Sequence, residues 1–338
     1  KFEDKALARA IAAEVLRWMV DLDGLIDSAT KKHLPDDAKV RMVLRMMLAQ
    51  WLRLQTPPHA VVATGLDLLA GGPRRLAHGV FSTLTKRGGA LPPAPTLPAE
   101  VATRWGDRAA SIAAGLADPP PLDLTLRDPA ETEHWQVQLS ADSLMPGHLR
   151  LPRGANVETL PGFAEGAWWV QDLAAALPAR LLGQGEGRHV LDLCAAPGGK
   201  TLQLAAQGWQ VTALDISAKR LKLLEENLKR TGLEAEVIAA DAFKWEPPTE
   251  NGAKFDAILI DEAAQMPVPF LQRVVQRHTN SNIAFATTTH GYEGTGRGFA
   301  LRFVEWLREL VVSLDLQGIT LVCQDWGGPL GMGVLSRE

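Results

Sequence analysis

The stretch from Val190 to Thr201 holds the residues with the clearest capacity for chemistry. It reads VLDLCAAPGGKT, an apolar strand candidate followed by a Pro-Gly-Gly turn and the first residues of a helix. Glycines let the backbone approach a ligand closely, and the start of a helix presents N–H groups that have no partner within the helix. About twenty residues later, where a doubly wound sheet places the group that binds ribose hydroxyls, the apolar run Val211 to Asp215 ends in a carboxylate. Together the two signals predict a site for a nucleotide-like cofactor.

A phosphate loop is the main alternative for the same residues. Gly199-Lys200-Thr201 matches the end of the pattern G-x-x-x-x-G-K-[ST], but its first glycine would fall at Cys194. Asp261-Glu262, which follows another apolar run, would then be the magnesium-binding pair of an ATPase. Pro197 and Asp215 fit a cofactor loop better, so the ATPase stays the second hypothesis.

The elements around these residues alternate between strand and helix from about Gly166 onward. The helix Ser217–Gly232 is the clearest of them, with apolar residues at helical spacing. The strand candidates are His189–Leu193, Val211–Asp215, Glu236–Ala240, Ala257–Asp261, Ile283–Thr287 and Ile319–Gln324. Such alternation predicts a parallel, doubly wound sheet with helices on both faces.

The first part of the chain has a different pattern. Apolar residues at helical spacing predict helices over 7–20, 40–54 and 59–69. Four prolines within 91–99 and the run Pro119–Pro121 break the chain. We therefore expect an all-helical domain over 1–120, a small connector with short extended runs over 121–165, and an α/β domain over 166–338 that becomes atypical from about 262.

Composition narrows the class of protein. The 338 residues are enough for two domains, 46% of them are hydrophobic and 22% charged, and no run is long and apolar enough to span a membrane. Two cysteines cannot form a disulfide framework, which favours a cytoplasmic location. A net charge of −4 means that any nucleic-acid contact must use local positive charge. Nine basic residues of the helical part form either a solvated surface or a phosphate-binding face: Lys31, Lys32, Arg41, Arg45, Arg53, Arg74, Arg75, Lys86 and Arg87.

Three segments carry a family resemblance over residues 1 to about 260. They are LAQWLRLQTPPHA at Leu48–Ala60, GAWWVQD at Gly166–Asp172 and DLCAAPGGKT at Asp192–Thr201. The chain there resembles the bacterial Sun/Fmu (RsmB-type) 16S rRNA cytosine-5 methyltransferases. The resemblance implies a NusB-like RNA-binding domain followed by a Rossmann-like domain that binds S-adenosylmethionine. With it we expect a monomer that acts on RNA, 16S rRNA in particular, and needs neither a metal nor a membrane.

The resemblance also implies roles at matching positions. Asp215 would bind the ribose of S-adenosylmethionine, Asp241 would lie by its adenine, and Asp261 would lie near the methyl group and the target base. The loop around the methionine end would consist of Cys194, Ala195, Ala196, Pro197, Gly198, Gly199 and Lys200.

The chain departs from the family where the chemistry is done. The family attacks C6 of cytosine with a cysteine thiolate, and a second cysteine helps release the product. After the fourth strand the family reads Asp-Ala-Pro-Cys, whereas residues 261–267 read DEAAQMP, and the later Thr-Cys-Ser motif is not recognisable. Cys194 lies within the cofactor loop, and the neighbours of Cys323 match neither motif. We expect cofactor binding without methyl transfer, and a non-catalytic protein that binds RNA and S-adenosylmethionine is the alternative to an active enzyme.

Two further resemblances cover the remaining residues. About 256–303 resembles the helicase-type ATPase part of tRNA(Met) cytidine acetyltransferases, in which Asp261-Glu262 would be the magnesium pair. About 303–338 is similar to haloalkane dehalogenases through QDWGG at Gln324–Gly328, although a strand-end turn without activity is the favoured interpretation there. Three partial resemblances joined end to end suggest a chimeric chain.

Overall fold

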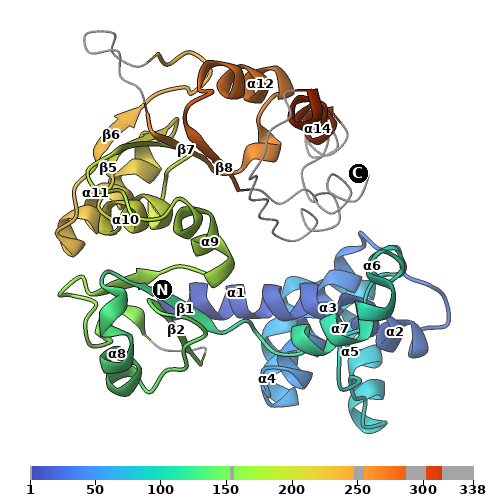
Figure 1. The fold of residues 1–338 in the computed structure, drawn as a ribbon. Coiled ribbons are helices and arrows are strands. Elements are labelled where there is room, and N and C mark those ends of the chain that lie inside the picture. The colour runs from blue at the N-terminus through green and yellow to red at the C-terminus, as the bar shows by residue number, and fades with distance from the viewer. Residues whose placement is uncertain (1, 153–155, 247–254, 287–301, 314–338) are drawn as a thin grey trace. The chain divides into compact units, whose positions relative to one another are not determined.

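The computed structural model describes residues 2–152, 156–246, 255–286 and 302–313 (Figure 1). The chain divides into two compact units, Lys1–Pro120 and Pro121–Glu338. The predicted strand at Ile319–Gln324, and the residues Cys323 and Asp325 with it, lie outside the described residues.

The first unit is helical. Its elements are α1 (Phe2–Arg17), α2 (Met19–Ser28), α3 (Lys39–Leu52), α4 (Pro58–Gly65), α5 (Gly71–Lys86), α6 (Ala99–Trp105) and α7 (Ala109–Leu116), with 3-10 turns at Leu66–Leu68 and Gly106–Arg108. The predicted single helix over 7–20 is wrong, because α1 ends at Arg17 and α2 begins at Met19. Trp18 lies at this break with its ring 1% exposed. Burial of that large ring in the helical core stabilises a turn that helical spacing alone does not predict.

Two of the nine basic residues are internal. Arg41 and Arg45 on α3 are buried, and both pair with Asp23 of α2 at N–O distances of 3.1 and 2.7 Å. Arg41 also bonds Asp27 at 2.7 Å, and this hydrogen bond holds the pKa of the Asp27 carboxyl below its usual value. These arginines join α2 to α3, so the prediction that they lie on a surface is wrong for them.

The second unit begins with a small antiparallel sheet. Its strands are β1 (Leu122–Leu126), β2 (His148–Leu151) and β3 (Trp168–Val170), in the order β2-β1-β3, with α8 (Thr132–Leu139) beside β2. Trp168 is fully buried in the core of this sheet, and Trp169 is 3% exposed. The two tryptophans are therefore core residues.

A five-stranded parallel sheet forms the rest of the unit. Its strands are β4 (His189–Leu193), β5 (Gln210–Asp215), β6 (Glu236–Ala239), β7 (Ala257–Ile260) and β8 (Asn282–Phe285). The order is β6-β5-β4-β7-β8, so the chain winds outward in both directions from β4. The five predicted strands in the described residues are confirmed, and so is the doubly wound α/β class.

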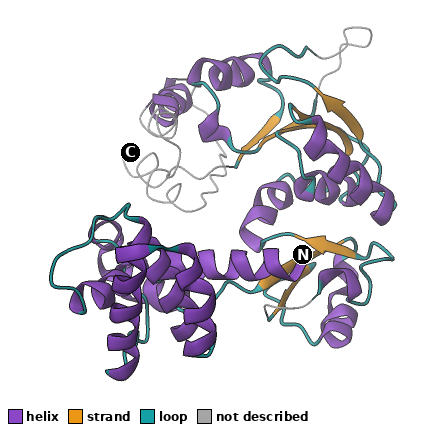
Figure 2. Cartoon of the chain, turned by 180° about the vertical axis from the view of Figure 1, so that it is seen from behind, coloured by secondary structure: helices purple, strands orange, loops and turns teal. Residues whose placement is uncertain are grey.

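Helices cover both faces of this sheet (Figures 1 and 2). The helices α9 (Leu173–Leu181), α10 (Gly199–Ala206) and α11 (Ala218–Thr231) pack on one face, and α12 (Val268–Arg277) and α14 (Val304–Ser313) pack on the other. Side chains of β4 reach both faces, Val190 on the first and Leu191 on the second. Ligand sites in such sheets lie beyond the carboxyl ends of the strands, where the strand order reverses. That point is the end of β4.

Candidate cofactor-binding site

The loop from Cys194 to Gly198 leads from β4 into α10. Two of its residues have left-handed backbone, Cys194 with φ +62° and Gly198 with φ +112°, and Gly198 is the N-cap of α10. A Cβ atom at position 198 would lie 2.4 Å from Cδ1 of Leu224. Position 198 therefore requires glycine both for its backbone angle and for its contact with α11.

Asp215 is joined to this loop by hydrogen bonds. Its Oδ2 accepts from the backbone N–H of Ala196 at 3.2 Å, and its Oδ1 accepts from that of Ser217 at 2.8 Å. The carboxylate is 3% exposed. The structure thus brings the end of β5 against the Pro-Gly loop, as the spacing predicts.

Arg220 completes this group, and the sequence reasoning missed it. Its Nη1 lies 3.5 Å from Oδ2 of Asp215, and its Nη2 donates to the carbonyl oxygen of Ala196. The available signal was its place in the first turn of α11, five residues after Asp215. A guanidinium there balances the charge of a nearly buried carboxylate.

Lys200 and Asp261 form the other side of the site. Lys200 lies in the first turn of α10, and its Nζ donates to Oδ2 of Asp261 at 2.7 Å. The two side chains are 13% and 27% exposed. The backbone N–H of Asp261 donates to the carbonyl oxygen of Leu193 at 3.1 Å, which places the end of β7 beside the end of β4.

Asp192 is a buried carboxyl behind the loop that the sequence reasoning did not single out as functional. It is fully buried, its Oδ2 accepts from the Thr201 hydroxyl at 2.6 Å, and its Oδ1 has no partner among the described residues. Burial raises the pKa of Asp192 to about 7, the Thr201 hydrogen bond lowers it, and the neighbouring carboxylate of Asp261 raises it further. A group of this kind is protonated or ionised according to small changes in its surroundings.

Asp241 follows β6 at the same edge of the sheet. The backbone N–H of Ala240 donates to the carbonyl oxygen of Asp215 at 3.1 Å, so the ends of β5 and β6 are adjacent. The Asp241 carboxylate accepts from the N–H of Phe243 at 3.0 Å and lies 3.5 Å from Nζ of Lys244.

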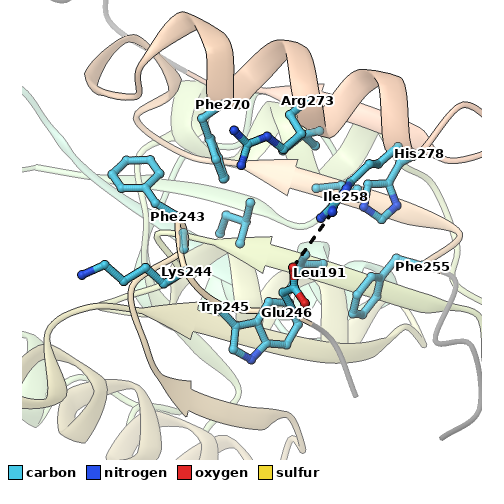
Figure 3. A pocket seen from close by; sticks show the side chains of 14 residues that line it. Leu191, Phe243, Lys244, Trp245, Glu246, Phe255, Ile258, Phe270, Arg273 and His278 are labelled. Atoms are coloured by element: carbon cyan, nitrogen blue, oxygen red, sulfur yellow. Dashed lines mark ion pairs between the residues drawn. The ribbon is translucent and has the colours of Figure 1, made fainter. Parts of the chain in front are cut away.

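A small cavity of about 110 Å³ lies next to this segment (Figure 3). It is lined by aromatic side chains from the segment after β6 and from α12, with the basic residues Arg273 and Arg277 among them. None of the residues 194–200 lines it, and neither Asp215 nor Asp261 does. The cavity belongs to the face of the sheet under α12, so it is separate from the loop site.

The segment after Asp261 shows what stands in place of the family thiol. Counting along Asp-Ala-Pro-Cys from Asp261, the cysteine position is Ala264, which is fully buried. Glu262 has left-handed backbone with φ +54°, and its carboxylate accepts from the amide of Gln265 at 3.4 Å. Neither residue can act as a sulfur nucleophile.

Cys194 does not take over that role. Burial raises the pKa of its thiol to about 12, and the carboxylates of Asp215, Asp261 and Asp192 act in the same direction. A thiol with such a pKa is almost entirely protonated near neutral pH, and the protonated form is a poor nucleophile. Within the described residues, this is the only cysteine.

Two absences apply to the described residues alone. They hold no cluster of three or more His, Cys, Asp or Glu side chains that could bind a metal ion. None of the helices among them is both long enough and apolar enough to cross a membrane. The histidine at 290 and the glycines of 291–298 fall outside these ranges.

Comparison with known proteins finds family matches in both units and a solved structure of similar fold. The NusB family matches residues 1–70, and the helicase domain of RNA cytidine acetyltransferase NAT10/TcmA matches residues 174–321, a longer stretch than the motifs near 256–303 indicated. The crystal structure of PH0851 is similar in fold, with a TM-score of 0.58 and 21% identity over 90% of this chain and 72% of that one.

Relatives in sequence are ribosomal RNA small subunit methyltransferases B. The protein from Pseudomonas syringae pv. tomato is 31% identical over 293 residues, which are 77% of this chain and 64% of that protein. The protein from Klebsiella pneumoniae is 31% identical over 288 residues, 77% of this chain and 66% of that one. The chain therefore spans slightly less than two thirds of the length of these curated relatives. In sequence the chain is similar to the ribosomal RNA small subunit methyltransferases B, and in fold it is similar to PH0851.

Proposed function

We propose that the chain binds S-adenosylmethionine at the carboxyl edge of the parallel sheet. The observation that carries this proposal is the Gly198 loop, which is held against Leu224 and hydrogen-bonded through Ala196 to Asp215. A loop of this shape exposes backbone N–H groups at the start of α10 to a ligand carboxylate. The names of the sequence relatives support the same cofactor class.

Each charged residue at this edge has a role in the proposal. Asp215 would accept hydrogen bonds from the ribose hydroxyls, with Arg220 balancing its charge. Asp241 would accept from the adenine amino group. The cofactor, when bound, supplies an electrophilic methyl group, and Lys200 holds Asp261 in place at the end of β7 beside it. The family resemblance, rather than the geometry alone, assigns Asp215 to the ribose and Asp241 to the adenine.

The binding proposal is tested by calorimetric titration of the purified chain with S-adenosylmethionine. We expect one binding site, and we expect Asp215→Asn to weaken the affinity for S-adenosylmethionine about tenfold or more. Both carboxylate oxygens of Asp215 accept hydrogen bonds, whereas asparagine has one acceptor oxygen and no charge. Asp256→Asn is the matched control: Asp256 also accepts a backbone N–H, that of His189 at 2.9 Å, but at the start of β4. Equal affinity in all three proteins would contradict the assignment.

The substrate class that we propose is RNA, 16S rRNA in particular, with C5 of cytosine as the family's target. The match of residues 1–70 to the NusB family and the names of the relatives support it. Six of the nine basic residues named above are exposed on the helical unit and could contact phosphate: Lys31, Lys32, Arg74, Arg75, Lys86 and Arg87.

In this chain we propose that the donor site is kept and methyl transfer is lost. Ala264 stands at the position of the cysteine of Asp-Ala-Pro-Cys, and the Cys194 thiol is held protonated. With labelled S-adenosylmethionine and 16S rRNA, we expect no label in the RNA above the level of a no-protein control. An active family member assayed in parallel is the positive control. Formation of 5-methylcytidine by the purified chain would contradict the proposal.

An ATPase is the second candidate, since residues 174–321 match a helicase-type family and Lys200 pairs with Asp261. Phosphate-loop enzymes use a lysine at the start of a helix to contact the phosphates and an aspartate at the end of a strand to hold magnesium. Titration with ATP and magnesium separates the two candidates. Binding and hydrolysis of ATP, lost in Lys200→Ala, would favour the ATPase, whereas the methyltransferase-type site predicts neither.

A further inference from the structure

A polar groove lies in the second unit away from the cofactor loop. Its volume is about 460 Å³, and it is formed by the turn after β1, the end of α9 and the end of α10. Arginine and glutamine side chains line much of it, among them Arg127, Arg180, Gln184, Gln203 and Gln207. No step proposed for the cofactor site uses these residues.

Arg180 brings a positive charge to this groove without a counter-charge. Its Nη1 donates to the carbonyl oxygen of Pro146 at 2.7 Å, but its Nε is buried and has no partner in the described part of the chain. Within the same residues no carboxylate oxygen lies within 4.0 Å of its guanidinium. Burial alone lowers the pKa of Arg180. Arg180 is half-buried, and a charge that is partly removed from water without a counter-charge is costly unless an anion compensates it.

A second unpaired guanidinium lines the groove. Arg127 donates from Nη1 to the carbonyl oxygen of Thr231 at 2.9 Å, and no carboxylate within the described ranges lies within 4.0 Å of it. Asp128 is the acidic residue of the lining, and its Oδ1 accepts from the N–H of Ala130 at 2.9 Å. Asp128 forms no ion pair within 4.0 Å with either arginine in the described residues, so the lining carries two positive charges against one negative charge.

The glutamines of the lining carry no charge, so the positive charge of the groove comes from its arginines. Gln203 is 4% exposed and is fixed by its donation to the carbonyl oxygen of Ala176 at 3.0 Å. Oε1 of Gln207 is buried and has no partner in the part of the chain that the structure describes. The groove thus offers two guanidiniums, while Nε of Arg180 and Oε1 of Gln207 are buried behind its surface. A phosphodiester provides the complementary charge.

We infer that this groove binds the sugar-phosphate backbone of RNA, with Arg127 and Arg180 as its phosphate contacts. The inference rests on the proposed function, because it takes the RNA substrate as the ligand. The helix α10 begins at the cofactor loop and ends at the groove, about 12 Å away at 1.5 Å per residue over its eight residues. One strand of RNA can therefore reach both places.

Fluorescence anisotropy of a labelled oligouridylate of about 20 nucleotides tests this inference on the full chain. Each phosphate contact that is lost reduces the magnitude of the slope of log K against log salt concentration by about 0.7, where K is the association constant. Near 0.1 M salt this corresponds to an affinity that is about fivefold lower. We expect this change in Arg180→Gln and in Arg127→Gln. Lys229→Gln, which removes one exposed charge on α11, is the control and should leave the slope unchanged. Circular dichroism checks that each variant is folded. Because Arg127 is exposed, Arg127→Gln tests the inference even if Arg180→Gln does not fold.

The outcomes separate this inference from the proposed function. Unchanged slope and affinity in both arginine variants would overturn the groove as an RNA contact. A second result would also overturn it: inorganic pyrophosphate stabilises the wild type against heat, both variants lose this stabilisation, and their RNA affinity is unchanged. The ligand of the groove would then be a free phosphate compound. Binding of S-adenosylmethionine, titrated separately, should be the same in both variants. Its absence in the wild type would end the cofactor proposal while leaving the RNA result to stand.

Discussion

Replacing Asp192 with Asn should raise the free energy of unfolding at about pH 8 by up to about 4 kcal/mol. Burial raises the pKa of this carboxyl from 3.8 to about 7 in the folded state. The folded chain therefore holds a proton that the unfolded chain releases, and the free energy of unfolding falls as pH rises from about 4 to about 7. Asparagine stays neutral, and its amide oxygen can still accept the bond from the Thr201 hydroxyl. The variant should lack this loss of stability.

Urea unfolding at about pH 5 and pH 8 measures the effect. The wild type should lose stability between these two values, and Asp192→Asn should lose less of it. Asp256→Asn is the control, since it changes an exposed aspartate directly before β7, the strand that pairs with β4. A parallel pH dependence in wild type and Asp192→Asn would show that Asp192 ionises near its ordinary pKa.

Gly166→Ala should destabilise the second unit by more than about 3 kcal/mol. Gly166 has φ +67°, and a Cβ there would lie 2.2 Å from the carbonyl oxygen of Arg230 and 2.5 Å from Cα of Thr231. Both are backbone atoms at the end of α11, so relief requires the loop before β3 to move away from that helix. Calorimetric melting of the purified variant is the measurement.

Gly183→Ala is the matched control for this substitution. Its φ is +70°, close to that of Gly166, but nothing lies within 4 Å of a Cβ built on it. It should therefore cost only the left-handed backbone strain of about 1 kcal/mol. If the two variants had the same melting temperature, the close approach of Gly166 to α11 would not contribute to stability.

Elements that depend on local pattern could be predicted from the sequence. The strands β4 to β8, the helix α11 and the place of Asp215 follow from apolar periodicity, turn residues and spacing. The position of Lys200 at the start of α10 follows from the Pro-Gly-Gly turn. These signals act over a few residues, so one sequence contains them.

Features that depend on contacts between distant segments could not be predicted from the sequence. The break at Trp18 needs the core that buries its ring, and the internal role of Arg41 needs the carboxylates of α2. The perturbed Asp192 needs the full burial that only the packed sheet provides. The unpaired charge of Arg180 needs the juxtaposition of α9, α10 and the turn after β1. Periodicity carries no information on such pairings.

The contacts of α11 have a mechanical consequence for the cofactor site. Leu224 packs on Gly198, and Arg220, one helical turn earlier, bonds both Ala196 and Asp215. Residues four apart lie on the same side of a helix, so one rigid face touches the loop and the end of β5 together. A displacement of α11 carries both parts with it and keeps their spacing. The relative position of the loop and of Asp215 thus depends on one rigid helix rather than on the separate conformations of several loops.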